Sequence, residues 1–425
     1  MQKEIPSWYR NRGYLHFDRQ VGLKKASKVV YSEAAVAKHS FYPFICFDIN
    51  SKKLTKDPST KKLISKPKTR PIAYAAHMDG HIYSYYAKQL SELYEAKLIE
   101  FGLDDCVLAF RNKGKSNIDF AFDAFNQIRK NGPCAAVALD FTKFFDTLDH
   151  DILKHQWATL LGVNRLPPDH FNVYGSLTKF SRVNRDVAYD QFGISKNNPK
   201  SNTRRICSAS DFRSKVRGDG LIMTNKEPFG IPQGSPISAL LSNIYMLTFD
   251  QEMKKYADVH GGKYYRYCDD MLFIVPTQLR DKVASFVQKN VKQLKVQINP
   301  SKTELRTFRN KAGQLVADKA LQYLGFIFDG ENIYLRSSSL ARYSEKMKRG
   351  VSLAKQTMRK YNRIRDDKGA LNKGIFMKKL YSRYTHLGGR NFVRYGLRAA
   401  DKMNSKTIRH QLKPLWRRFH EELYK

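Results

Sequence analysis

Cysteine pairs and long apolar runs are both lacking in this sequence. Its five cysteines are scattered and form no Cys-x-x-Cys pair, which favours reduced thiols over a disulfide framework or a zinc ribbon. No apolar run approaches the roughly 18 residues that a membrane span needs. The N-terminal stretch has no apolar core of the kind found in secretory signals. We therefore expect a cytoplasmic protein.

Acidic residues are also scarce, which leaves a strongly basic chain. Lys and Arg number 76 against 39 Asp and Glu, a net charge of +37. Self-repulsion of this size strains a compact fold and is tolerated when a polyanion shares the working state, most commonly a phosphate backbone. The 26 Phe, 24 Tyr and 3 Trp offer surfaces on which bases stack. A basic ribosomal or membrane-surface protein has a similar composition, so composition alone leaves both readings open.

The 425 residues suit two or three subdomains of mixed secondary structure. Apolar spacing predicts helices at 78–100, 118–128 and 279–295 and a buried strand at 134–141. Ser235 as N-cap and Pro236 at the first helical position predict another helix start, with Ile237 to Leu247 on its buried face. Two runs of the β type, TELRTF and LQYLGFIF, follow the third helix and are expected to be strands.

Two regions are notably basic. Residues 179–217 hold ten Lys and Arg against three Asp, and the whole stretch 175–228 is expected to be an insertion or flap with little core of its own. Residues 341–425 hold 24 Lys and Arg against six Asp and Glu, a net charge of +18. Their helical pattern, interrupted at Gly388-Gly389, predicts a basic helical bundle.

Adjacent carboxylates at Asp269 and Asp270 separate two β-rich runs, 263–268 and 271–275, which predicts a tight hairpin with both acids at its tip. Asp is a favoured turn residue, so a plain turn is the simpler alternative for this pair taken alone. Asp140 changes the balance, because it ends a buried strand that would lie beside the hairpin. Three carboxylates at one sheet edge form an oxygen-rich site suited to magnesium, and nucleotidyl transfer uses a pair of such ions.

A series of motifs in a fixed order gives a specific resemblance. Tyr267-Cys268-Asp269-Asp270 resembles the Tyr-x-Asp-Asp signature of reverse transcriptases. The run from Asp140 to Asp146 resembles their first palm motif, and 230–236 resembles their Pro-Gln-Gly motif. Four supporting blocks follow the family's order: Lys68 to Ile72, Ala109 to Ser116, Asn299 to Lys302, and Tyr323 to Phe326. Each block alone is weak, but seven in order over about 66–328 make chance agreement remote.

The resemblance implies a role for the matched acids and for one aromatic residue. Asp140 and Asp269 would be the main ligands of two Mg²⁺ ions, with Asp270 in support and the main-chain carbonyl of Phe141 contributing. Phe145 stands where the family keeps a bulky sugar gate. A ring packed under C2′ leaves no room for a 2′-hydroxyl, so deoxynucleotides would be preferred.

Further members of the nucleotide site are expected from the same resemblance. Arg70 with Lys68 or Lys66 would clamp the triphosphate, and Gln233 and Gly234 would lie against the incoming nucleotide. Lys302 would donate a proton to the pyrophosphate or screen its charge. Lys143 and Phe144 would lie beside the gate. For each cation the alternative is a solvated loop position, and for Phe144 and Phe145 it is a place in the core.

Other acids and histidines have simpler explanations. Asp146 and Asp149 are expected to cap the helix after the strand. His77 and His81 are four residues apart, but Met78 stands where a zinc protease needs glutamate and Gly80 weakens the required helix, so a core or surface pair is expected instead. We find no nuclease, zinc-finger, integrase or RNase H segment, which argues against a full intron-mobility or retroviral protein.

Within the family, the stretch Trp8 to Asp18 and the basic insertion look most like bacterial defence-associated reverse transcriptases of type 2, and the retron signatures Asn-Ala-x-x-His and Val-Thr-Gly are missing. This resemblance implies antiphage defence, with a partner non-coding RNA as template, a primer–template duplex and dNTPs. The alternatives are a retron-type or group II intron-like maturase enzyme without the defence role, and an RNA-dependent RNA polymerase, against which Tyr267-Cys268 and Phe145 both speak.

The resemblance also implies the architecture, an α+β right-hand polymerase fold with an antiparallel palm sheet and a helical thumb. The expected ranges are 1–60 for an N-terminal extension, 61–135 for fingers, 136–335 for palm with its insertion, and 336–425 for the thumb. The oligomeric state and the priming mechanism are left open by the sequence.

Overall fold

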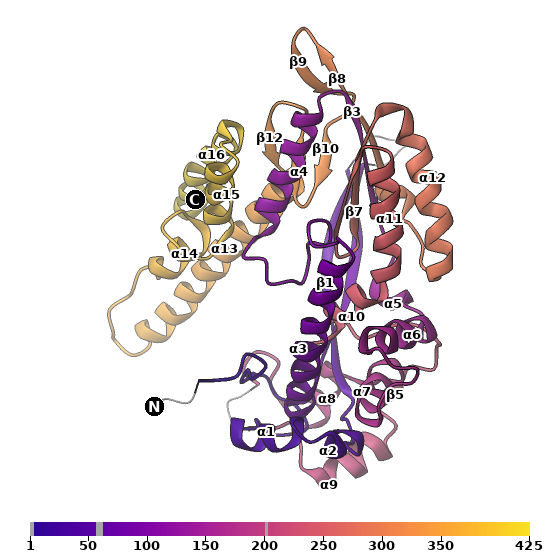
Figure 1. Ribbon diagram of the computed structural model, residues 1–425. Helices are drawn as coiled ribbons and strands as arrows, with labels where there is room; N and C mark the ends of the chain where they lie inside the picture. The colour runs from indigo at the N-terminus through magenta and orange to yellow at the C-terminus, as the bar shows by residue number, and fades with distance from the viewer. Residues whose placement is uncertain (1–3, 57–62, 200–202) are drawn as a thin grey trace.

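The computed structural model describes residues 4–56, 63–199 and 203–425 (Figure 1). It is of the α+β class, as predicted, and is centred on a five-stranded sheet in which all neighbouring strands are antiparallel. In spatial order the strands are β6 (Lys263–Tyr267), β7 (Asp270–Val275), β3 (Cys134–Asp140), β8 (Glu304–Lys311) and β9 (Gln314–Ala317). None of the helices in the described ranges has the length and apolar character to cross a membrane.

Strand β3 forms the middle of this sheet because both of its faces are apolar. All seven of its residues are buried. Ala135, Val137 and Leu139 point into one hydrophobic core, whereas Cys134, Ala136 and Ala138 point into a second. Alternate residues of a strand face opposite sides of the sheet, so a continuous apolar run is what a strand between two cores requires. The first core is covered by α3 (His77–Glu100), α6 (His150–Leu161), α10 (Ser238–Tyr245), α11 (Leu247–Val259) and α12 (Arg280–Val291).

The C-terminal part supplies most of the second core. A three-stranded antiparallel sheet of β10 (Leu321–Tyr323), β11 (Phe326–Phe328) and β12 (Ile333–Leu335) packs there with α4 (Asn117–Asn131) and the C-terminal helices. The expected single strand LQYLGFIF is therefore wrong, because Leu324 and Gly325 both adopt positive φ and fold the run into the β10–β11 hairpin. The helices are α13 (Ser337–Asp366), α14 (Met377–Tyr384), α15 (Phe392–Lys402) and α16 (Lys406–Tyr424), with Gly388-Gly389 between helices, as predicted.

A second sheet lies toward the N-terminal part, in the order β2-β1-β4-β5. Strand β1 (Phe44–Lys56) pairs antiparallel with β2 (Leu63–Tyr74) and parallel with β4 (Ser181–Asn184), which in turn pairs with β5 (Met223–Thr224). The boundary expected at residue 60 falls between the paired strands β1 and β2, and the four expected ranges remain a prediction. The remaining elements are α1 (Leu23–Val30), α2 (Glu33–Ala37), α5 (Phe144–Thr147), α7 (Pro168–Thr178), α8 (Arg185–Gln191), α9 (Ala209–Asp211), a π-helical turn (Phe212–Gly218) and 3-10 turns at Thr277–Leu279, Lys292–Leu294 and Pro300–Lys302.

The basic stretch 175–228 has more core than expected, which corrects the prediction of a flap. Its residues Val183, Tyr189, Phe212 and Val216 belong to a third hydrophobic cluster, which also contains Ile45 of β1 and two N-terminal residues, Leu15 and Phe17. The ring of Phe17 lies 4.8 Å from that of Phe212. The stretch is therefore held by apolar contacts with residues far earlier in the sequence. No local pattern within 175–228 could reveal these contacts.

Helices α3, α4 and α12 and the β6–β7 hairpin confirm the sequence predictions, with ends shifted by a few residues. The helix start at Ser235 is wrong. α10 begins at Ser238, because Pro236 and Ile237 form a turn instead, and Ser235 accepts a hydrogen bond from Ser238 through its main-chain oxygen. The predicted buried face from Ile237 to Leu247 is buried throughout at Ile237, Leu240, Leu241, Ile244 and Leu247.

His77 and His81 form a buried pair on α3, which is the core alternative of the two that the sequence predicted. Their rings stack on Tyr14 and Tyr9 of the N-terminal segment, with centroid distances of 5.1 and 4.8 Å. Gly80 lies between them because a β-carbon there would meet the Arg12 guanidinium at 3.2 Å. Within the described ranges no three His, Cys, Asp or Glu side chains form a group able to hold a metal ion.

We predict that two buried histidines, His16 and His81, make the stability of the protein pH-dependent. Burial lowers the pKa of His16 to about 3 and that of His81 to about 4, whereas both titrate near 6.5 in the unfolded chain. Below about pH 6.5 the unfolded state binds protons that the folded state refuses, so the free energy of unfolding falls with decreasing pH by up to about 1.4 kcal/mol per pH unit for each histidine. Urea unfolding between pH 7 and pH 5 measures this slope.

The matched variants are H81F, which removes one buried titrating group, and H155F, at an exposed histidine. H81F should flatten the slope by roughly one proton, and H155F should leave it as in the wild type. Equal slopes in all three proteins would contradict the assignment.

Candidate active site

The pairing of β3 with β7 brings the predicted acids to one edge of the central sheet. Asp140, the last residue of β3, lies directly opposite Asp270, the first residue of β7. The intervening turn is closed by the pairing of Tyr267 with Asp270. The amide of Phe141 donates a hydrogen bond of 3.3 Å to the carbonyl of Asp269. Acids that are 129 positions apart in the sequence therefore meet at the tip of one hairpin, as the sequence predicted.

The local electrostatics show that these carboxylates are short of positive charge. Burial raises the pKa of Asp270 to about 7, and the neighbouring charges of Asp269 and Asp140 and a hydrogen bond with Asp140 add to the rise. The Lys302 ammonium provides partial compensation by donating a hydrogen bond to the Asp140 carboxylate. Lys302 is held close because the Asn299 amide donates to the Asp140 carbonyl at 2.7 Å, which ties the Asn-Pro-Ser-Lys turn to the end of β3.

The donor set fits magnesium, although among the residues that the structure describes no three acidic side chains are already arranged around one point. Lys302 engages Asp140, and the hydrogen bond between Asp140 and Asp270 draws their oxygens toward each other. Burial raises the pKa of the Asp270 carboxyl and neighbouring carboxylates add to the rise, and a divalent cation bound there would compensate both effects. Carboxylate oxygens are also the ligands that magnesium prefers, with the remaining positions filled by water or phosphate oxygens.

The segment after β3 places three aromatic rings at the site. The Phe144 ring is buried and stacks on Phe141 at a centroid distance of 4.9 Å. Phe144 is therefore a core residue, which was the alternative to a place in the nucleotide site. Phe145 is only partly buried and meets Phe144 edge-on at 5.8 Å. Its carbonyl accepts a hydrogen bond from Ile231. Lys143, which is exposed, adopts φ +48° as it starts the short helix α5.

The Pro-Gln-Gly loop lies between α5 and strand β2. The Gln233 side chain hydrogen-bonds to Asp146, whose pKa is raised by burial and lowered in part by that bond. The Gln233 carbonyl accepts from the Ala73 amide at 2.7 Å. Gly234 has φ +111°, and a β-carbon there would lie 2.4 Å from the Ala73 carbonyl oxygen. The close approach that requires glycine is thus to strand β2.

This geometry also settles the two proposed helix caps. The Asp149 carboxylate accepts hydrogen bonds from the amides of Asp151 and Ile152 at the start of α6, which confirms its cap role. The cap role predicted for Asp146 is wrong, because this residue lies inside α5 and bonds Gln233 instead.

The predicted triphosphate clamp lies on β2. Arg70 is exposed and pairs with Ile49 of β1, three residues before Ala73, whose amide bonds the Pro-Gln-Gly loop. At about 3.3 Å per residue this places Arg70 roughly 10 Å further along the strand. Lys68 lies on the same strand, but its side chain and that of Lys66 fall outside what the structure describes.

Sequence reasoning missed the group that supports the turn from behind. Arg266 of β6 is fully buried and pairs with Asp250 of α11. Asn243 of α10 also accepts a hydrogen bond from Arg266. The signal in the sequence is a charged residue at an inward position of an alternating strand, immediately before Tyr267.

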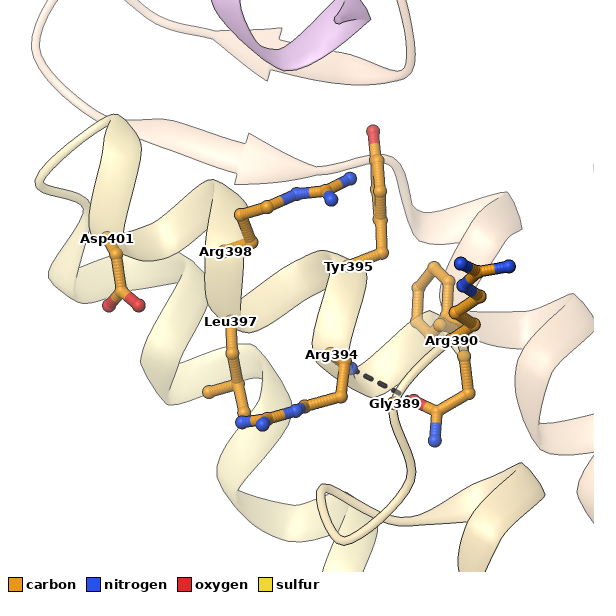
Figure 2. Close-up of a pocket in the computed structure, with 9 residues that line it drawn as sticks. Gly389, Arg390, Arg394, Tyr395, Leu397, Arg398 and Asp401 are labelled. Carbon is orange, nitrogen blue, oxygen red and sulfur yellow. Dashed lines mark hydrogen bonds between the residues drawn. The ribbon is translucent and has the colours of Figure 1, made fainter. Parts of the chain in front are cut away.

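A second feature of interest is a hollow of about 540 Å³ at the start of α15 (Figure 2). Arg390, Arg394 and Arg398 line it, together with Asn391 and Tyr395. None of these three arginines forms an ion pair with any residue in the described ranges. Arg394 and Arg398 are four residues apart on α15 and are separated by about 6 Å along the helix axis, within reach of neighbouring phosphates on a nucleic-acid strand, and Arg390 lies just before the helix. The Tyr395 hydroxyl accepts from Asn117 of α4 at 2.8 Å, which fixes α15 against α4.

Comparison with known proteins identifies the matched part of the chain. A family model described as reverse transcriptase (RNA-dependent DNA polymerase) matches residues 60–328. No curated protein matches. Similar solved structures include three of telomerase from Candida tropicalis. An apo form truncated of its C-terminal domain has 13% identity and a TM-score of 0.40, with 67% of this chain and 57% of that chain covered. A further apo form has 14% identity and a TM-score of 0.38, with 69% of this chain and 52% of that chain covered, and a complex with a TWJ fragment of telomeric RNA has 13% identity and a TM-score of 0.39, with 89% and 55% covered. The chain therefore spans little more than half the length of these structures.

We predict that Gly234→Ala destabilises the protein more than a substitution that only strains the backbone. The added methyl would collide with the Ala73 carbonyl and push the Pro-Gln-Gly loop off β2. Gly102→Ala is the matched control, because Gly102 has φ +63° and open space around its β-carbon position. The control should lose about 1 kcal/mol of unfolding free energy in urea, and Gly234→Ala should lose more. A loss no larger than the control's would contradict the clash.

Proposed function

The chain belongs to the reverse transcriptase family, and from this premise we propose that it is an RNA-directed DNA polymerase of right-hand fold in which Asp140, Asp269 and Asp270 form the catalytic centre with two magnesium ions. The observation that carries the proposal is the register of β3 with β7, which sets Asp140 opposite Asp270. The ions would supply activation of the 3′-hydroxyl and charge compensation for the leaving pyrophosphate.

The chain's own residues position the reactants and balance charge. Asp140 and Asp269 would hold the ions with Asp270 in support, and the Phe141 carbonyl would contribute an oxygen ligand. Lys302, whose ammonium bonds the Asp140 carboxylate, would donate a proton to the leaving pyrophosphate or screen its charge. Arg70 with Lys68 would bind the triphosphate, and Gln233 and Gly234 would support the base and sugar.

Selection of deoxynucleotides is proposed to depend on Phe145. Its ring is partly exposed, and its main chain is fixed by the bond from Ile231, so its position relative to the Pro-Gln-Gly loop is set. Phe144 holds it from the side by an edge-on contact. A ring fixed in this manner under the sugar would exclude a 2′-hydroxyl by steric contact. Lys143 lies beside it and would face the phosphates.

The template is proposed to be a non-coding RNA that stays bound to the protein, and the biological role to be bacterial antiphage defence. The net charge of +37 and the +18 of residues 341–425 exceed what gripping a short primer–template requires. The unpaired arginines of the α15 hollow provide one place for RNA phosphates. The N-terminal stretch that carries the subgroup resemblance is part of the fold, because the Asp18 carboxylate caps α3 at His77 and Met78.

We expect the double variant D269A/D270A to abolish DNA synthesis and antiphage protection without loss of fold or RNA binding. Removing both carboxylates eliminates two of the proposed metal ligands while relieving repulsion between like charges. The matched control is D366A/D367A, an adjacent pair of exposed aspartates at the end of α13. Primer extension with dNTPs or NTPs, circular dichroism and phage plating provide the readouts, and wild-type protein should use dNTPs. Nucleotide incorporation that persists in D269A/D270A would overturn the catalytic assignment.

We also expect R394E/R398E to weaken binding of a structured RNA hairpin by at least about tenfold and to reduce the salt dependence of binding by about two phosphate contacts. K24E/K25E, a charge reversal of equal size on exposed positions of α1, is the control. Filter binding over a salt series measures both quantities, and sequencing of the RNA purified with each protein identifies the partner. Identical salt slopes for the two variants would remove α15 from the RNA-binding surface.

A further inference from the structure

Arg266 is a fully buried charged group directly behind the proposed catalytic hairpin. Strand β6 alternates between partly exposed and buried positions, and Arg266 occupies a buried one, with no exposed surface. A sheet of this kind normally places an apolar side chain at such a position. Burying an unpaired guanidinium is prohibitive, so the surrounding chain must supply acceptors for it.

Those acceptors come from two helices and from the turn. The guanidinium meets Asp250 of α11 in a two-pronged pair, Nε to Oδ1 at 2.7 Å and Nη2 to Oδ2 at 2.5 Å. Its remaining arm, Nη1, donates to the Asn243 side chain at 3.0 Å and to the carbonyl of Cys268 at 3.2 Å. Tyr264 donates a further hydrogen bond to Asp250 at 2.8 Å.

The Arg266 main chain is fixed as well. Its amide donates to Cys106 at 2.8 Å, and its carbonyl accepts from Leu108 at 2.9 Å, so the segment 106–108 covers the free edge of β6. The Asn243 side chain donates to the Ala109 carbonyl at 2.9 Å and joins the same support. Hydrogen bonds therefore fix both the main chain and the guanidinium of Arg266, and Nη1 donates to the turn from this fixed position.

The turn needs such support because its backbone is strained. Cys268 adopts φ +59°, a left-handed conformation that non-glycine residues rarely take. Strain of this kind persists where the surrounding structure determines the conformation. The bond from Arg266 fixes the direction of the Cys268 carbonyl, and with it the peptide plane that leads to Asp269.

We propose that Arg266 is a positioning residue, which uses its buried pair with Asp250 as an anchor and holds the Cys268 carbonyl so that Asp269 and Asp270 point to the metal site. The network is a poor device for stability alone, since buried ion pairs are commonly matched by apolar replacements of similar volume. The hydrogen bond from Arg266 Nη1 to the Cys268 carbonyl is one that an apolar side chain could not form. This inference rests on the proposed role of the two aspartates.

The test combines the variant R266K with a readout that needs no metal. Lysine keeps the charge opposite Asp250 but cannot bond Asp250, Asn243 and Cys268 together, because it lacks the planar fork. In metal-free protein, hydrogen exchange at residues 267–271 should accelerate by about tenfold, with exchange elsewhere unchanged. In primer extension, kcat should fall by about 100-fold, with KM for dNTP unchanged.

Two further variants make the result decisive. R12K is the matched control, because Arg12 is a partly buried arginine that bonds Ser84 of α3 and none of the proposed catalytic residues; it should behave as wild type. R266M/D250L removes both charges and leaves none unpaired, and should reproduce the local exchange and the loss of kcat if R266K fails to fold.

Unchanged exchange at the turn in a folded variant, or an unchanged kcat, would overturn the proposal. Accelerated exchange across the whole chain in both Arg266 variants would show that the residue only stabilises the fold. If wild-type protein synthesises no DNA, the proposed function fails, but the exchange at the turn still reports on Arg266.

Discussion

The antiparallel register between β3 and β7 is the constraint on which the active site depends. Successive side chains of a strand face opposite sides of the sheet, so a slip of one residue would turn Asp140 away from Asp270 and move every alanine and valine of β3 into the wrong core. The small and branched residues on the two faces of β3 therefore fix the position of the acid at its end. In this molecule the same residues that stabilise the sheet also set the geometry of the proposed catalytic site.

Placing three carboxylates together creates an excess of negative charge. Basic side chains lie at three distances from these carboxylates, and each has a different effect. Lys302 contacts Asp140 directly. Behind the turn, Arg266 is neutralised by Asp250 and so adds orientation without adding net charge. Far from the site, arginines of the basic C-terminal helices such as Arg394 have no acidic partner within the described part of the chain. The first two features organise the site, whereas the third is suited to a polyanion that follows the chain's surface.

Local sequence patterns predicted the parts of this fold that local physics decides. The hairpin at Asp269-Asp270, the buried strand ending in Asp140 and the helix α3 all follow from apolar periodicity and turn chemistry. The failures have equally definite causes. The β10–β11 turn places Leu324 at positive φ, where sequence rules expect glycine or asparagine. Arg266 was missed because its partners lie on other elements, and a charged residue in a strand looks exposed until those partners are known.

The third hydrophobic cluster has a consequence for biosynthesis. Leu15 and Phe17 leave the ribosome early, but their packing partners Phe212 and Val216 are made about 200 residues later. At a synthesis rate of roughly 5–20 residues per second, the nascent chain waits on the order of 10–40 s before this cluster can close. During that interval β1 also lacks its parallel neighbour β4. Folding of this region is therefore completed only after the basic stretch has emerged from the ribosome.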